Sequence, residues 1–83
     1  MADLRTMAEL YEAQGRFADA AAMVGREVLA WEAILGREDL GLASGLLEYA
    51  RLLRLAGKES EAIEAERRGH AIHARSDPRA PAR

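Results

Sequence analysis

The sequence contains no cysteine and few aromatic residues, and both absences limit what the protein is. Without cysteine, its 83 residues hold no disulfide, no thiolate metal ligand and no cysteine nucleophile. Aromatic residues make up 5% of the chain, so a core has to be built from aliphatic side chains and alanine. Both prolines lie in the last six residues, which leaves the rest of the chain open to helix formation.

Long apolar runs and an excess of one charge are also missing. No apolar segment approaches the ~20 residues that a membrane-spanning helix needs, and no signal-peptide pattern precedes the first expected helix. Lys and Arg number 12 against 14 Asp and Glu and are spread along the chain, so no surface is marked for nucleic acid or anionic lipid. We therefore expect one small cytoplasmic domain with no nucleic-acid or membrane partner.

What the sequence does contain is an internal repeat at an offset of 42 residues. Gly15 and Gly57 align at that offset, and each falls where a helical pattern has to stop. Within the two units, the other identities are Leu4 with Leu46, Ala8 with Ala50, Leu10 with Leu52, Ala20 with Ala62 and Arg26 with Arg68. The sequence therefore predicts two similar units, repeat one over about 2–36 and repeat two over about 39–75.

Each unit has the pattern of two helices. Apolar residues recur at helical spacing over 2–14, 17–35, 40–56 and 59–75, and Gly36 separates the two units. Loops of two to four residues make neighbouring helices antiparallel. We predict an all-α fold of two stacked antiparallel helical hairpins, with 76–83 as a disordered tail.

The same periodicity selects the residues that face the core. Small side chains are expected where paired helices approach most closely, at Ala8, Ala20, Ala50 and Ala62. The core stripe of 17–35 consists of Phe17, Ala20, Ala21, Val24, Val28, Trp31 and Leu35. The core side of 40–56 consists of Ala43, Leu46, Leu47, Ala50 and Leu53, and Asp39 is the expected N-cap of that helix.

The segment from Leu4 to Ala20 resembles a tetratricopeptide repeat at its large, small, aromatic, glycine, aromatic and alanine positions. With its 42-residue period and the connection Leu35-Gly36-Arg37-Glu38, the chain is similar to the longer repeats of kinesin light chains and of bacterial multi-repeat regulators. The resemblance implies a non-enzymatic module that binds a protein or peptide.

Repeat two departs from this pattern in its second helix. Glu59 stands where repeat one has Phe17, and Glu66 stands where it has Val24. In the family these two positions pack against the following repeat. We therefore interpret 59–75 as a polar C-terminal cap.

The first hairpin has no such cap, and two repeats are fewer than the three that a solenoid usually needs. We expect the chain to self-associate, first of all as a dimer, through Met7, Leu10, Trp31 and Leu35. The alternatives are a purely structural oligomerisation unit and a piece of a larger multi-repeat regulator. Trp31 itself has two interpretations of equal weight: an interface anchor, or a side chain that closes the end of the second helix against the third.

The resemblance also implies a groove lined by the first helix of each hairpin. Its positions correspond to Ala2, Arg5, Glu9, Glu12 and Ala13, and to Ser44, Leu47, Arg51, Arg54 and Leu55. Arg51 and Arg54 could grip a ligand carboxylate by bidentate hydrogen bonds. We prefer the simpler interpretation, in which Glu9 and Glu12 neutralise the two arginines.

Candidates for catalysis and metal binding are few. The hydroxyl groups belong to Thr6, Tyr11, Ser44, Tyr49, Ser60 and Ser76, and no pattern places a histidine base beside one of them. We expect no enzymatic activity and no cofactor. Glu66, His70 and His73 share one helical face and could meet a zinc ion, but structural zinc takes four protein ligands, so we prefer a solvated face.

Overall fold

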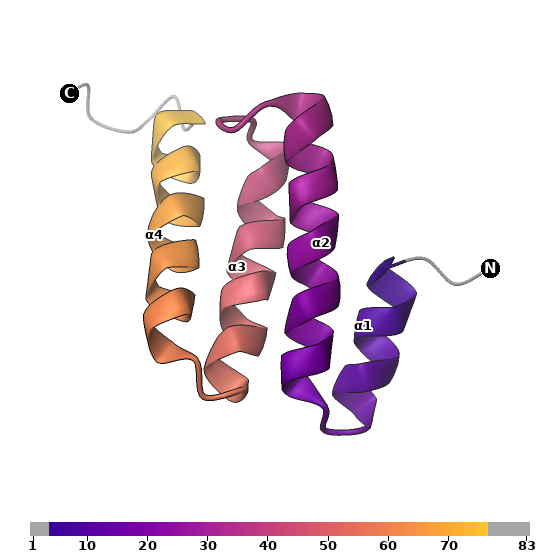
Figure 1. The fold of residues 1–83 in the computed structure, drawn as a ribbon. Helices are drawn as coiled ribbons and strands as arrows, with labels where there is room; N and C mark the ends of the chain where they lie inside the picture. The colour runs from indigo at the N-terminus through magenta and orange to yellow at the C-terminus, as the bar shows by residue number, and fades with distance from the viewer. Residues whose placement is uncertain (1–3, 77–83) are drawn as a thin grey trace.

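The computed structural model describes residues 4–76, and it folds them into four helices in a row (Figure 1). Successive helices are antiparallel and are joined by short turns. They are α1 (Leu4–Ala13), α2 (Phe17–Leu35), α3 (Gly41–Leu55) and α4 (Glu59–Ser76), and the described residues contain no strand. The predicted all-α fold of helical hairpins is confirmed.

The predicted tail begins one residue too early, because Ser76 belongs to α4. Residues 77–83, on which the rest of that prediction falls, lie outside the described residues, and so does Ala2 of the expected groove. Among the helices that are described, none is long and apolar enough to cross a membrane.

The two hairpin turns have the same hydrogen bonds, 42 residues apart. Gly15 has φ of 76°, and the amide of Arg16 donates to the carbonyl of Tyr11 at 2.8 Å. Gly57 has φ of 82°, and the amide of Lys58 donates to the carbonyl of Leu53, also at 2.8 Å. This is the Schellman ending, in which a left-handed glycine closes the helix. The repeat seen in the sequence therefore has a counterpart in backbone geometry.

The side chain of Asp39 caps the start of α3, as predicted, although the N-cap position of the helix falls one residue later, at Leu40. Asp39 Oδ1 accepts the amide hydrogen of Gly41 at 2.7 Å, and the carbonyl of Asp39 accepts the amide hydrogen of Leu42 at 3.0 Å. The carboxylate thus satisfies one of the amides that the first turn of α3 leaves without a helical partner.

The core is built from small and aliphatic side chains of all four helices. The four alanines predicted at the closest approaches, Ala8, Ala20, Ala50 and Ala62, are all buried. The prediction for α3 missed two leucines, since Leu42 and Leu52 are buried as well. α3 packs against α2 on one side and α4 on the other, so it buries a wider arc of its surface than a single stripe provides.

The core stripe predicted for α2 is wrong at its C-terminal end. Trp31 is 49% exposed and Leu35 is 41% exposed. The physical reason is a difference in length: α1 has 10 residues and α2 has 19, so they extend over ~15 Å and ~28 Å. The pair between Arg5 and Glu27, at 3.3 Å, marks the level at which α1 begins. The last two turns of α2 extend beyond that level (Figure 1).

Candidate functional site

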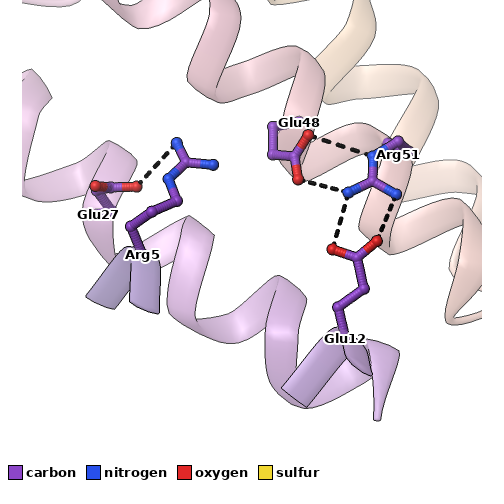
Figure 2. Close-up of polar contacts among 5 residues, drawn as sticks. All are labelled: Arg5, Glu12, Glu27, Glu48 and Arg51. Atoms are coloured by element: carbon purple, nitrogen blue, oxygen red, sulfur yellow. Dashed lines mark hydrogen bonds and ion pairs between the residues drawn. The ribbon is translucent and has the colours of Figure 1, made fainter. Parts of the chain in front are cut away.

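The first candidate is the charged cluster that links α1 to α3, drawn in Figure 2. Arg51 donates to both carboxylate oxygens of Glu12 at 2.8 and 3.0 Å, and to both oxygens of Glu48 at 2.6 and 3.3 Å. The hydrogen bonds from Arg51 lower the pKa of Glu12. The preferred interpretation, in which glutamates of α1 neutralise the arginines, thus holds for Glu12 and Arg51. It does not hold for Glu9, which is exposed on α1.

Arg54 is neutralised as well, but by α4 and not by α1. Its guanidinium donates to Glu66 at 2.6 and 3.1 Å and to Glu59 at 3.0 and 3.2 Å. The hydrogen bonds from Arg54 lower the pKa of Glu66, and the charge of His70 adds a smaller effect in the same direction. The two glutamates that distinguish α4 from α2 in the repeat alignment therefore serve as partners of one arginine.

This pairing bears directly on the zinc hypothesis. Glu66 already holds Arg54, and within residues 4–76 no three His, Asp or Glu side chains are arranged to hold a metal ion. The geometry gives His70 and His73 no third ligand. Both histidines are exposed on α4.

Between α3 and α4 lies an open groove of about 370 Å³, the second candidate. Its lining comprises Leu47, Arg51, Arg54 and Leu55 from α3 with Glu66 and His70 from α4. Four of the residues expected in a ligand groove thus come together here. The contribution of α4 was missed, since the sequence pattern assigned the groove to the first helix of each hairpin. Each arginine already holds two carboxylates, so the groove is not an empty receptor for an anion.

The other expected groove residues lie elsewhere. Arg5 pairs with Glu27 of α2, and both border a small hollow of about 90 Å³ together with Trp31 and Ser44. Trp31 therefore borders a hollow that the start of α3 also lines, and about half of its surface is exposed to solvent. Ala13 is exposed at the end of α1. Residues expected in one groove thus line two separate hollows, one between α3 and α4 and one beside Trp31.

The third candidate is an exposed apolar surface on α2. We name its exposed residues the outer face of α2: Ala22, Arg26, Leu29, Ala30, Ala33 and Ile34. Leu29 is 66% exposed and Ile34 is 72% exposed. Trp31, Leu35 and Leu40 are half-exposed large side chains around the same end of the helix. A contiguous apolar surface of this kind typically marks an interaction site on a soluble protein.

The residues predicted for self-association are only partly at this surface. Trp31 and Leu35 lie near the C-terminal end of α2, as this surface does. Leu10, in contrast, is exposed on α1, and Met7 is half-buried on α1. Leu29 and Ile34, the most exposed large apolar side chains of the described chain, were missed. They were missed because, in a helix rich in alanine and leucine, hydrophobic periodicity separates buried from exposed positions only weakly. The available sign was that four apolar residues, Leu29, Ala30, Ala33 and Ile34, share one side of a helix, with Arg26 as the charged residue beside them.

Ion pairs hold the C-terminal end of α2 to α4 and to the connection that follows α2. Glu32 accepts from Arg37 at 3.0 Å and pairs with Arg68 of α4 at 3.0 Å. Arg68 is the main cause of a lowered pKa at Glu32, with Arg37 acting in the same direction. Arg75 of α4 pairs in turn with Glu38. The outer face of α2 is therefore presented by a helix end that is tied to α4.

No family model matches the chain, and the comparisons with curated proteins and with solved structures find no match either.

Proposed function

We propose that the protein is a non-enzymatic interaction module that associates with itself through its N-terminal hairpin. One observation carries this proposal: the outer face of α2 leaves about two thirds or more of Leu29 and Ile34 exposed, on the part of α2 that extends beyond α1. Burying a leucine or isoleucine side chain contributes ~1.5–3 kcal/mol. Association that covers several of them supplies stability that a short chain has little room to gain in its own core.

The groove between α3 and α4 is a weaker candidate for the binding surface. Its two arginines are engaged by Glu12, Glu48, Glu59 and Glu66, so an incoming carboxylate would have to displace an intramolecular partner. Exchanging one charged hydrogen bond for another gains little free energy. Within residues 4–76, in contrast, no ion pair or side-chain hydrogen bond engages the outer face of α2.

We further propose a kinship with tetratricopeptide repeats that rests on the internal duplication, and two features of the geometry agree with that duplication. The hairpin turns at Gly15 and Gly57 share their hydrogen bonds at the repeat offset, and the alanines that align between the two units are buried at the helix contacts. Proteins of this class use helical hairpins as scaffolds for contacts with other chains, which agrees with an interaction module.

The proposal is tested with a pair of matched charge variants. Ile34→Glu places a charge on the outer face of α2, and Leu55→Glu places one on a half-exposed leucine of α3. Light scattering after size-exclusion chromatography gives the mass of each variant, and circular dichroism checks that both are folded. We expect Leu55→Glu to keep the mass of the parent protein and Ile34→Glu to fall to the 9.1 kDa of one chain. If Ile34→Glu leaves a multiple of that mass unchanged, the outer face of α2 is not the contact.

A further inference from the structure

The outer face of α2 has the spacing of a helix that packs lengthwise against another helix. Ala22, Arg26, Leu29 and Ala33 follow one another at intervals of four, three and four residues, which is the spacing of a coiled-coil seam. Ala30 and Ile34 flank this row. The face therefore fits a helix better than it fits a loop or an extended peptide.

Large and small side chains alternate along the row in a way that suits a second copy of the same helix. If two α2 helices run antiparallel and cross about midway between Leu29 and Ala33, Leu29 lies opposite Ala33 of the second copy. The two-fold axis then repeats that contact on the other side. An alanine opposite each leucine allows the helix axes to approach to about 8 Å.

Charge supports the same arrangement. Arg26 is the charged residue within the outer face, and this register sets it opposite Gly36 of the second copy, where α2 ends. A helix C-terminus carries a partial negative charge, and the last turn of α2 contains no basic residue to offset it. Arg37, which follows that end, is turned toward Glu32.

The parallel arrangement is disfavoured for the same reason. In a parallel pair related by a two-fold axis, each residue of the row faces its own copy. Arg26 would then lie beside Arg26 of the second chain, and two like charges would oppose the contact. The leucines would also meet leucines and leave the alanines apart.

We propose that a second copy of this chain docks its α2 antiparallel on the outer face of α2, with Arg26 of each chain at the C-terminal end of the other α2. This inference rests on the proposed self-association and adds the partner, the direction and the register. Each chain contributes the same residues, so the contact closes on itself as a dimer.

Cysteine cross-linking tests the direction and the register, because the chain has no cysteine of its own. In the antiparallel register, Ala30 of the two chains is offset by about 3 Å along the helix axes, whereas Ala18 is offset by about 39 Å. A disulfide needs Cα atoms within about 7 Å. Ala18 and Ala30 are both exposed alanines of α2, so Ala18→Cys is the matched control for Ala30→Cys.

Under mild oxidation we expect Ala30→Cys to become a covalent dimer and Ala18→Cys to remain a single chain. Equal cross-linking at both positions would indicate a parallel pair and overturn the inference. A parent protein of dimeric mass whose Ala30→Cys variant does not cross-link would also overturn it, while leaving self-association intact. A parent protein that has the mass of one chain would overturn the inference and the proposed function together.

Charge variants give an independent readout. Arg26→Glu sets a negative charge beside the negative end of the second helix, and two such contacts form per dimer. We expect the dissociation constant of the dimer to rise about tenfold. Arg26→Lys keeps the charge and is expected to keep the dissociation constant. Equal behaviour of the two variants would contradict the proposed role of Arg26.

Discussion

Glu12 of α1 and Arg51 of α3 form a bidentate ion pair across 39 residues of sequence, with nitrogen–oxygen distances of 2.8 and 3.0 Å. Within the described chain, the backbone of α1 packs against α2 and not against α3. The pair is therefore a direct link between the first helices of the two hairpins (Figure 2). The ion pair joins α1 to α3 through side chains, whereas the packing of both helices against α2 brings them near each other.

Removing this link is expected to cost little. Both side chains are partly exposed, so Arg51→Met should lower the free energy of unfolding by about 1 kcal/mol or less. Glu12 and Glu48 regain water when the arginine is gone, which limits the loss. Urea unfolding of the parent, Arg51→Met, Glu12→Gln and the double variant would measure the coupling between the two residues. Strictly additive effects would show that the ion pair contributes nothing.

Acid should destabilise the protein through the same carboxylates. The pKa values of Glu12, Glu32 and Glu66 are held below the ordinary value of 4.5 by their arginine partners. A lowered pKa in the folded state contributes stability that is present above the unfolded pKa and is lost as the pH falls through the folded pKa. We expect the melting temperature to decline as the pH falls below about 4.5, measured by circular dichroism down to about pH 3.

Glu12→Gln is the control for that prediction, because glutamine cannot lose or gain a proton in this range. Its melting temperature should decline less steeply with acid than that of the parent protein. Identical slopes would mean that the pair with Arg51 has no part in the acid response.

Gly69 lies at a close contact between α3 and α4. A Cβ atom at this position would lie 3.0 Å from Leu47 Cδ2 and 3.3 Å from the carbonyl oxygen of Ala43. The backbone oxygen cannot move aside as a side chain can, so Gly69→Ala should overpack the contact by about 1–3 kcal/mol. Alanine returns ~1 kcal/mol through its helix propensity. We expect a net loss of stability in urea unfolding.

Gly25→Ala is the comparison for Gly69→Ala. The three heavy atoms nearest to a Cβ atom at Gly25 all belong to Tyr49, a half-buried side chain that can shift where a backbone oxygen cannot. Its stability should change less than that of Gly69→Ala. A larger loss at Gly25 than at Gly69 would show that the α2–α3 contact, and not the α3–α4 contact, limits the packing.

Much of the fold could be predicted from the sequence, because its signals are local. Left-handed glycines end helices wherever they occur, so Gly15, Gly36 and Gly57 defined the elements, and the bounds of α2 were predicted without error. Of the expected neutralisation of Arg51 and Arg54 by Glu9 and Glu12, the pair of Arg51 with Glu12 is present in the structure. These inferences need only the spacing of residues along one or two helices.

The candidate site could not be predicted to the same extent, since it depends on what neighbouring helices leave uncovered. Periodicity shows that Trp31 continues the core stripe of α2, but it does not show that α1 begins beside Glu27. It likewise cannot show that Arg54 turns to Glu66 on α4 and away from α1. Exposure of Leu29 and Ile34 is a property of the assembled helices and not of α2 alone.

Self-association through the outer face of α2 is the proposal on which the dimer and its register depend. Sedimentation equilibrium of the parent protein, at concentrations across the micromolar range, measures this directly. We expect a mass of two 9.1 kDa chains that declines toward one chain on dilution. A folded protein that keeps the mass of one chain at every concentration would contradict it.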